Sequence, residues 1–329
     1  MTDTVLEFNA WQPGYEALVQ RVGLVDLGAR TLIELTGKDR AAFLHNLCTN
    51  EVRKLSAGQG CEAFLTTVQG KTLGHVFIWI GSESTVLDTV PGQSDTLLKH
   101  LDHYLVCEQV ELADRSEAWH ELLLAGPDSA ALLSRLGAAP VPAGRLTHVQ
   151  TELAGKPASI RRTDIAGPES YLISVSTGDV ETVRAALLAG SAEPVEMAAF
   201  EAARIEQGFP LFGPDMSDKN LPQELARDPL AISFVKGCYL GQETVARIDA
   251  LGHVNKTLVG LRFDGFEIPP LGAELTVDNQ VVGQVTSATY SPKLAVPLAL
   301  GFVKRGPNAI GSRLESKFGP VEVVALPLK

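Results

Sequence analysis

The residues best suited to chemistry in this sequence lie in the octapeptide Lys236-Gly237-Cys238-Tyr239-Leu240-Gly241-Gln242-Glu243. Its cysteine stands between two glycines, which adopt backbone conformations closed to other residues, so the segment predicts a tight turn that presents the thiol. A nearby cation favours the thiolate, and Lys236 is the local candidate. A helix expected from Gln242 would add a favourable dipole at its N-terminus. A buried structural cysteine is the alternative, because thiols are among the most buried side chains.

A second candidate is a carboxylate near the end of a predicted helix. Residues 196–207 predict a strong helix that ends at Gly208. Glu206 and Ala199 fall on one face of this helix, with other small side chains beside them, which leaves room for a flat ligand. A solvated surface glutamate is the alternative on spacing alone. Residues 208–231 are rich in proline, glycine and aspartate, and they predict a long irregular loop of the kind that is often functional.

Composition excludes several classes of protein. The chain has 329 residues, 45% hydrophobic and 20% charged, with a net charge of −11. The sequence contains no lysine- or arginine-rich run of the kind that indicates nucleic-acid binding. No apolar stretch reaches the roughly 18 residues of a membrane span, and the N-terminus lacks the basic region of a secretory signal. We therefore expect a chain that binds neither nucleic acid nor membrane. We also expect it to be cytoplasmic and monomeric, although composition does not fix the oligomeric state. The cysteines are too scattered for a zinc site or a disulfide framework, and we predict no metal site: Cys48, Cys61, Cys107 and Cys238.

The first third of the chain predicts an α+β unit, placed at residues 1–115. Residues 14–28 predict a helix followed by a short strand, and a second helix begins with Asp39 as its N-cap. Hydrophobic patterning predicts the remaining elements: strands at 31–35, 61–65, 75–80, 85–90 and 106–112, and a helix at 92–104.

The middle of the chain loosely repeats this order, so we place a second α+β unit at residues 116–253. It includes the helix that carries Glu206 and the cysteine loop, which can pack back on the first unit. Its other predicted elements are strands at 121–124, 159–162 and 171–175 and helices at 126–136 and 179–188.

The last part of the chain, residues 254–329, predicts a small β-barrel. Short β-rich runs are separated by glycine, proline and asparagine turns, with Asp278-Asn279 as a tight hairpin turn. The predicted strands are 258–263, 274–277, 280–288, 298–303 and 321–325.

The octapeptide pattern KGCYxGQE resembles the signature of the YgfZ family of folate-binding proteins, relatives of the glycine-cleavage T-protein (aminomethyltransferase). Arg204–Gly213 is similar to the R-x-E-x-G-x-P segment of that family. The likeness covers roughly residues 15 to 327, and these shorter matches extend it: Thr49-Asn50, Gln69-Gly70-Lys71, Gly283–Ser287 and Ser291-Pro292. The resemblance implies an α+β, three-domain T-protein-like ring of two similar α+β units plus a small C-terminal β-barrel, with tetrahydrofolate at its centre. It makes the first unit, residues 1–115, the expected folate-binding domain.

The same resemblance implies roles for individual residues. Glu206 matches the carboxylate that binds the pterin, and one carboxylate can accept two parallel N–H donors from an aminopterin edge. Tyr171, near the turn at residues 167–169, is expected to help line the site. We also expect Arg204, Asn50 and Lys71 to bind the cofactor, although a helix C-cap is the alternative role for Asn50.

One departure bears on catalysis. The aminomethyltransferases carry an aspartate in the loop that matches Val68–Thr72, and this loop has no carboxylate here. Loss of a placed acid or base commonly lowers a rate by about 10²–10⁴. The resemblance therefore favours a tetrahydrofolate-binding protein that assists iron–sulfur cluster assembly or repair, and it leaves open whether the chain is an enzyme.

In that reading Cys238 is the working thiol, Glu206 is the pterin anchor, and both reach one shared cavity. Iron–sulfur proteins or their assembly machinery are the expected partners. Cys238 cannot hold a cluster alone, because a cluster usually needs four thiolates. The alternative is a folate-dependent aminomethyltransferase or demethylase that acts on an unknown amine.

Overall fold

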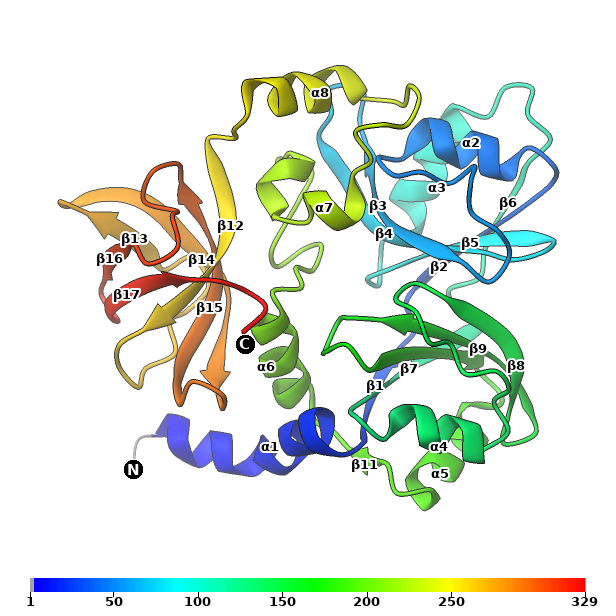
Figure 1. The fold of residues 1–329 in the computed structure, drawn as a ribbon, viewed down its shortest axis with the longest axis horizontal. Coiled ribbons are helices and arrows are strands. Elements are labelled where there is room, and N and C mark those ends of the chain that lie inside the picture. The colour runs from blue at the N-terminus through cyan, green and yellow to red at the C-terminus, as the bar shows by residue number, and fades with distance from the viewer. Residues whose placement is uncertain (1–2, 329) are drawn as a thin grey trace.

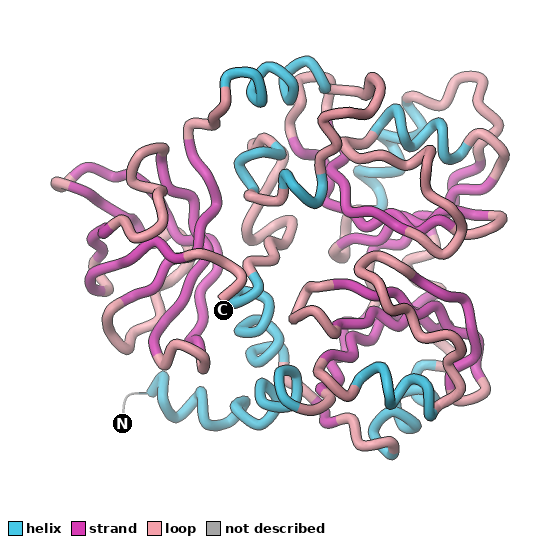
Figure 2. The backbone as a smooth tube through the Cα atoms, in the orientation of Figure 1, coloured by secondary structure: helices cyan, strands magenta, loops and turns pink. Residues whose placement is uncertain are grey.

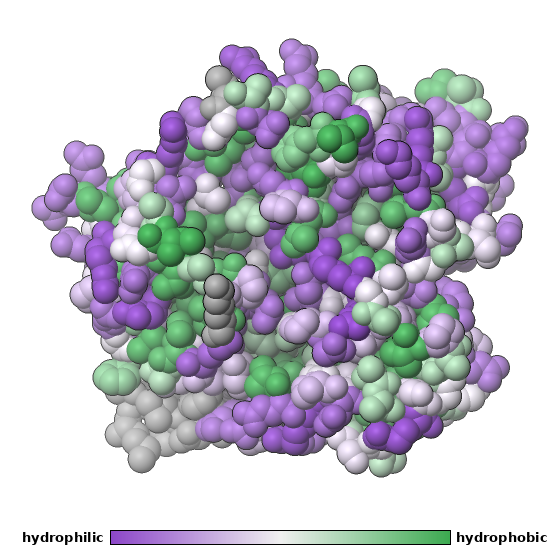
Figure 3. All heavy atoms as spheres, viewed as in Figure 1, coloured by the Kyte–Doolittle hydropathy of each residue, from purple (hydrophilic) through white to green (hydrophobic). Residues whose placement is uncertain are grey.

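The structure is a computed structural model that describes residues 3–328. Figure 1 shows two α+β units stacked on one side, a β-barrel on the other, and helix α6 (Met197–Gln207) between them. Figure 2 shows that loops make up much of the chain between α6 and the barrel. The face in Figure 3 is hollowed between the barrel and the α+β units, with hydrophobic and hydrophilic residues around the hollow. None of the described helices is both long and apolar enough to cross a membrane.

The first unit is a five-stranded antiparallel sheet in the order β3-β4-β5-β2-β6. Its elements are β2 (Thr31–Thr36), α2 (Arg40–Leu47), β3 (Gly60–Thr66), β4 (Thr72–Ile80), β5 (Ser84–Thr89), α3 (Ser94–His103) and β6 (Glu111–Asp114). Side chains alternate along β4, so Val76 and Ile78 pack against α2 and α3 on one face. Phe77 and Trp79 point to the other face and join a cluster shared with the second unit.

The second unit is a six-stranded sheet in the order β11-β1-β7-β10-β9-β8. Its elements are β1 (Gly23–Gly28), β7 (Trp119–Ala125), α4 (Ser129–Arg135), β8 (His148–Leu153), β9 (Lys156–Thr163), β10 (Ser170–Ser176), α5 (Val180–Ala189) and β11 (Glu193–Pro194). Leu122 and Leu124 pack with α4 and α5. Leu123 and Leu172 join the cluster that contains Phe77 and Trp79, so the two sheets face each other through that cluster.

The N-terminal elements lie outside the unit to which the sequence assigned them. Strand β1 pairs antiparallel with β7, from Gly23 opposite Ala125 to Asp26 opposite Leu122, and it pairs parallel with β11. Helix α1 (Asp3–Gln20) lies against α6 rather than against the first sheet. The boundary drawn at residue 115 therefore separates β1 from the sheet that it completes.

The barrel is closed in the order β12-β15-β14-β13-β16-β17. Its strands are β12 (Lys256–Phe263), β13 (Glu274–Val277), β14 (Gln280–Ser291), β15 (Val296–Lys304), β16 (Arg313–Ser316) and β17 (Gly319–Val324). Asp278 and Asn279 both have positive φ, 50° and 61°, as a two-residue hairpin turn requires. The predicted fold class, two α+β units with a C-terminal barrel, is confirmed.

Local differences from the predicted elements have physical causes. The strand predicted at 106–112 is only β6, because the amides of Val106 and Cys107 turn to bind the Glu108 carboxylate. Asp39 does precede α2, but its side chain accepts from the Gln109 amide at 2.8 Å and does not cap the helix. Strands β8, β11 and β16 were missed. The 208–231 loop contains η1 (Pro222–Leu225) and α7 (Asp228–Ala231), and α8 (Gln242–Leu251) follows the octapeptide turn.

Candidate functional site

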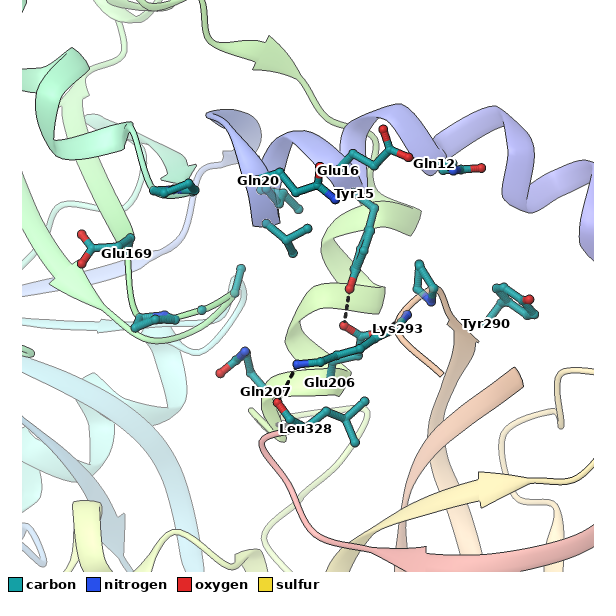
Figure 4. A pocket seen from close by; sticks show the side chains of 18 of the residues that line it. Gln12, Tyr15, Glu16, Gln20, Glu169, Glu206, Gln207, Tyr290, Lys293 and Leu328 are labelled. Carbon is teal, nitrogen blue, oxygen red and sulfur yellow. Dashed lines mark hydrogen bonds between the residues drawn. The ribbon is translucent and has the colours of Figure 1, made fainter. Parts of the chain in front are cut away.

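A cavity of about 680 Å³ lies where α1, α6, the barrel and the second α+β unit meet. Its size falls in the range of small-molecule sites. Figure 4 shows Tyr15 from α1 and Glu206 from α6 pointing toward one another at this cavity. Polar lining residues come from α1, the 166–169 turn, the end of α6, the end of β14 and the hairpin after it: Gln12, Tyr15, Glu16, Gln20, Glu169, Glu206, Gln207, Tyr290 and Lys293.

Glu206 is the best-positioned carboxylate in this cavity. Its side chain is held from two other elements, since the Tyr15 hydroxyl on α1 donates to Oε2 at 2.6 Å and the Ser291 hydroxyl on β14 donates to Oε1. The Lys293 amide makes a longer contact of 3.4 Å with Oε1. Glu206 is only 5% exposed, which excludes the alternative of a solvated surface glutamate.

These contacts leave Glu206 with remaining capacity to bind a ligand. Each carboxylate oxygen can accept about two hydrogen bonds. Oε2 accepts only from Tyr15, so its second acceptor position is free. The second acceptor position of Oε1 is filled only by the long contact with the Lys293 amide. Burial, together with the bond to Glu206, raises the pKa of Tyr15 well above its usual range, so the hydroxyl remains a donor. Lys293 Nζ donates to the Leu328 carbonyl at 2.9 Å and so ties the C-terminal segment to this cavity (Figure 4).

Tyr171 and Arg204 do not line this cavity. Tyr171 is fully buried in the core of the second unit, and its hydroxyl donates to Glu169 at 3.1 Å. Arg204 joins α6 to the barrel, because its guanidinium donates to Asp215 and to the Ser287 hydroxyl, both at 2.9 Å. Both side chains therefore stabilise the surroundings of the cavity and lie outside the lining itself.

Asn50 and Lys71 lie on the first unit and also do not line the cavity. Asn50 Nδ2 donates to the carbonyls of Glu62 and Leu230 at 2.8 and 2.9 Å, which ties β3 to α7 and gives Asn50 no C-cap role. Lys71 Nζ donates to the Lys219 carbonyl at 2.9 Å. These residues support the segment that leads to the octapeptide.

Lys236 holds the octapeptide on the end of helix α2. Its Nζ donates to the carbonyls of His45, Cys48 and Asn50 at 2.6, 2.7 and 2.9 Å. An ammonium group has three donors, so all of them are in use. Burial lowers the pKa of Lys236. The expected role of Lys236 as activator of the Cys238 thiolate is not found, because the ammonium is directed at these carbonyls.

Cys238 itself is exposed, which excludes the alternative of a buried structural cysteine. The turn depends on Gly241, whose φ is +80° and whose missing Cβ would lie 2.5 Å from the Thr67 carbonyl oxygen. The Leu240 amide donates to the Asn46 carbonyl at 2.9 Å. The octapeptide therefore packs back on the first unit and presents the thiol to solvent.

The thiol and the Glu206 cavity are separate. Cys238 is not among the residues that line the cavity, and Figure 1 shows α6 and α8 on opposite sides of α7. The physical reason is that Lys236 fixes the cysteine loop to α2, whereas Glu206 faces α1 and the barrel. The prediction of one cavity shared by the sulfur and the acid is therefore not supported.

Sequence reasoning missed two residues of structural weight, Tyr15 and Glu62. Tyr15 lies 191 residues before Glu206, and nothing in the pattern of α1 marks it as a partner. Glu62 is fully buried on β3 and accepts hydrogen bonds from His75, Arg145 and Arg227. A carboxylate within an otherwise apolar strand was the signal that could have revealed Glu62.

Comparison with known proteins extends along nearly the whole chain. Residues 4–230 match the model of the GCVT N-terminal domain, and residues 256–328 match that of the glycine cleavage T-protein C-terminal barrel domain. A putative chloroplastic transferase of Arabidopsis thaliana is 30% identical over 94% of this chain and 72% of its own length. An aminomethyltransferase of Thermus thermophilus is 28% identical over 92% of this chain and 85% of its own length.

A solved structure shows the same fold. The glycine cleavage system aminomethyltransferase T from Bartonella henselae superposes with a TM-score of 0.88 at 20% identity, and the match covers 96% of this chain and 88% of that one. The two domain matches span both α+β units and the barrel. The chain belongs to the glycine cleavage T-protein family.

Proposed function

We propose that this chain binds tetrahydrofolate in the cavity at Glu206, with the carboxylate as the anchor of the pterin. The observation that carries the proposal is a buried carboxylate, oriented by hydroxyl groups from α1 and β14, in the lining of a cavity of about 680 Å³. The pterin edge offers parallel N–H donors, and the two oxygens of Glu206 have room to accept them. The rest of the lining supplies further polar contacts.

We further propose that the chain is a YgfZ-like member of its family, a cytoplasmic monomer that assists iron–sulfur cluster assembly or repair through Cys238. The octapeptide pattern and the exposure of the thiol support this role. In this proposal Cys238 acts as a nucleophile, a transient ligand or a redox contact toward iron–sulfur proteins or their assembly machinery. It does so at a surface distinct from the folate cavity.

Calorimetric titration of the purified chain with tetrahydrofolate tests the folate proposal. A charged hydrogen bond contributes about 1.5–3 kcal/mol, so Glu206→Gln should weaken binding by about 10- to 100-fold. Glu83→Gln, at an exposed turn between β4 and β5, is the matched control and should bind as the wild type does. Equal affinity of Glu206→Gln and the control would contradict the proposal.

The thiol proposal is tested in a strain that lacks this chain. Cys238→Ala should fold, bind tetrahydrofolate with wild-type affinity and fail to restore the activity of iron–sulfur enzymes. Cys107→Ala is the control, since Cys107 is also exposed and lies outside the octapeptide. Full restoration by Cys238→Ala would count against the role of the thiol.

A one-carbon transferase or demethylase is the second candidate, and the relatives named aminomethyltransferase favour it. The Val68–Thr72 loop lacks a carboxylate, which argues against glycine-cleavage chemistry in particular. Incubation with tetrahydrofolate and a panel of amine donors tests this candidate. Formation of methylene- or methyl-tetrahydrofolate would support it, and a panel without product would weigh against it.

A further inference from the structure

The octapeptide turn lies against a histidine that uses only one of its two ring nitrogens within the fold. His45 stands in the last turn of α2, and its side chain is only 4% exposed. Its Nδ1 lies 3.0 Å from Glu51 Oε1, and the Val52 amide is farther away, at 3.5 Å. A carboxylate only accepts hydrogen bonds, so the nearer partner places the ring proton on Nδ1. Nε2 of the neutral ring is therefore left with a lone pair.

The second nitrogen, Nε2 of His45, faces the octapeptide. It makes no hydrogen bond with any residue from 3 to 328, and it is not among the unpaired side-chain atoms that are closed off from solvent. The missing Cβ of Gly237 would lie 3.9 Å from this nitrogen, and no other described atom beyond its chain neighbours would lie within 4 Å. The next residue is Cys238, whose thiol is exposed. An unpaired acceptor on a buried side chain calls for an explanation, and this one opens beside the exposed thiol.

The turn is fixed to the helix that carries this histidine. Lys236 donates to the His45 carbonyl at 2.6 Å, and the Leu240 amide donates to the Asn46 carbonyl at 2.9 Å. Figure 1 shows the chain between α7 and α8 running beside α2. These two contacts stand two positions before and two positions after Cys238 in the sequence. They hold the middle of the turn, with its thiol, against the end of α2 where Nε2 is unpaired.

The backbone of the turn does not require a glycine at position 237. The φ angle of Gly237 is negative, a range open to other residues, whereas that of Gly241 is +80°. A Cβ at 3.9 Å from Nε2 would also make only an ordinary van der Waals contact. Such a side chain would, however, cover the nitrogen. The glycine therefore keeps Nε2 accessible at the residue next to the thiol.

We propose that His45 is the base that takes the proton of the Cys238 thiol, and that Glu51 is its positioning residue. The S–H bond of Cys238 breaks and an N–H bond forms at Nε2, directly or through one water molecule, while Glu51 offsets the positive charge of the ring. The inference rests on the proposed role of Cys238 as a working thiol. It supplies the base that Lys236 does not provide, because the three donors of Lys236 are bound to carbonyls.

The charges around His45 determine the pH range in which it can accept a proton. Burial and the charge of Lys236 lower its pKa, and together they outweigh the carboxylate of Glu51. The imidazole is therefore neutral at pH 7 and remains so somewhat below its usual pKa of about 6.5. The charged groups that face it are Glu51 and Arg53 in the loop after α2 and Lys236 in the octapeptide.

The pH dependence of iodoacetamide alkylation at Cys238, followed by mass spectrometry between about pH 5.5 and 8, tests the base. All proteins carry Cys107→Ala, which removes the other exposed thiol of the described residues. The rate in this parent should level off near neutral pH, where His45 is already unprotonated. His45→Asn keeps a donor toward Glu51 and lacks Nε2. Its rate should rise about tenfold per pH unit, as that of an ordinary thiol does, and should be about tenfold below the parent near pH 6.5.

A second variant guards against misfolding as the cause of a slower rate. Gly237→Ala leaves His45 and Glu51 in place and covers Nε2, so it should slow alkylation near pH 6.5 by about threefold or more. Gly178→Ala is the matched control, since Gly178 also has a negative φ and its Cβ position is open. Parallel pH profiles in the parent and His45→Asn would overturn the proposal. A slower rate in His45→Asn without any change in Gly237→Ala would also overturn it.

The outcome of this experiment is independent of the proposed cellular role. Alkylation needs no iron–sulfur partner, so it reports on the base alone. Complementation by Cys238→Ala reports on the cellular role of the thiol. A levelled pH profile together with full complementation by Cys238→Ala would retain the base and reject the iron–sulfur role.

Discussion

The carboxylate of Glu62 should be the most sensitive single group for the stability of this chain. It is fully buried on β3 and accepts from His75 Nε2 at 2.8 Å. Arg227 donates to both of its oxygens, at 2.7 and 2.6 Å, and Arg145 donates to one of them. Arg145 also pairs with Asp164 at 2.9 Å in the second unit. One carboxylate thus joins the first sheet, the second unit and the segment before α7.

Glu62→Gln keeps the shape of the side chain and removes its charge. The glutamine offers a single acceptor oxygen, so Arg227 loses its bidentate partner and the buried guanidinium is left without full compensation. Breaking a buried ion pair in this way typically costs about 3–5 kcal/mol. With an unfolding entropy of about 0.7 kcal/mol/K for 329 residues, a loss of about 4 kcal/mol lowers Tm by about 6 °C.

Thermal and urea unfolding at pH 7 measure this effect. The matched control is Glu34→Gln, since Glu34 pairs at 2.9 Å with Arg115, whose side chain is 51% exposed. A surface pair of this kind contributes below about 1 kcal/mol, so the control should lose about 1 °C or less. The reasoning is refuted if the two variants unfold at the same temperature.

Acid provides a second measurement on the same carboxylate. Burial alone would raise the pKa of Glu62, but the bonds from His75 and Arg227 and the charge of Arg227 outweigh it and hold the pKa well below the usual 4.5. As pH falls, Glu62 is therefore protonated in the unfolded chain before it is protonated in the folded one. The stabilisation of the fold by the Glu62 carboxylate is present above pH 4.5 and is lost as pH falls below that value. Wild-type stability should decline more steeply in acid than that of Glu62→Gln.

Three further predictions follow from other contacts. Tyr15→Phe removes the 2.6 Å hydrogen bond to Glu206, so tetrahydrofolate affinity measured by calorimetry should fall by about 5- to 10-fold, and wild-type affinity would contradict the positioning role. Lys236→Met should leave the alkylation rate of Cys238, followed by mass spectrometry, unchanged or faster, whereas a slower rate would restore Lys236 as activator. The pKa of Asp228 is about 7 in the folded chain, so its burial destabilises the fold increasingly as pH rises from about 4 to 7. Asp228→Asn should therefore gain stability relative to the wild type over that interval, and a parallel pair of Tm–pH curves would refute this.

Elements with a strong local pattern were predictable from the sequence. The alternation in β4 places Val76 and Ile78 on one face and Phe77 and Trp79 on the other, as a strand between two covered faces requires. Helix α6 ends at Gly208 in the left-handed conformation, with φ at +68°. In both cases the residues that determine the element are neighbours in the sequence.

Pairing between distant segments was not predictable. The buried run at the start of β1 suits the edge of either sheet, and only the three-dimensional structure shows that Leu24 lies opposite Leu124. The contact between Tyr15 and Glu206 has the same character, since it depends on how α1 crosses α6. Local sequence patterns indicate which residues are buried. The residue that each of them contacts depends on how whole helices and strands pack.

Lys236 shows how proximity in sequence misled the assignment of a role. The lysine lies two positions before the cysteine, with only Gly237 between them, so activation was the simplest expectation. Helix α2, however, ends at Leu47, and the carbonyls of His45 and Cys48 at that end carry partial negative charge. The long lysine side chain reaches these carbonyls, and their attraction for the ammonium explains why it is held at the end of α2.

The separation of Glu206 from Cys238 limits how the two proposed sites can cooperate. A ligand group held by Glu206 in the cavity cannot contact the thiol, because Cys238 does not line that cavity and its loop is fixed to α2 through Lys236. Direct transfer of a one-carbon unit from folate to this sulfur would therefore require the three Lys236 hydrogen bonds to break. Without that movement, Glu206→Gln should weaken folate binding by about the same 10- to 100-fold while Cys238 remains as reactive as before. Cys238→Ala should leave folate affinity intact. If either substitution altered the other site, the loop between α6 and α8 would have to move when folate binds.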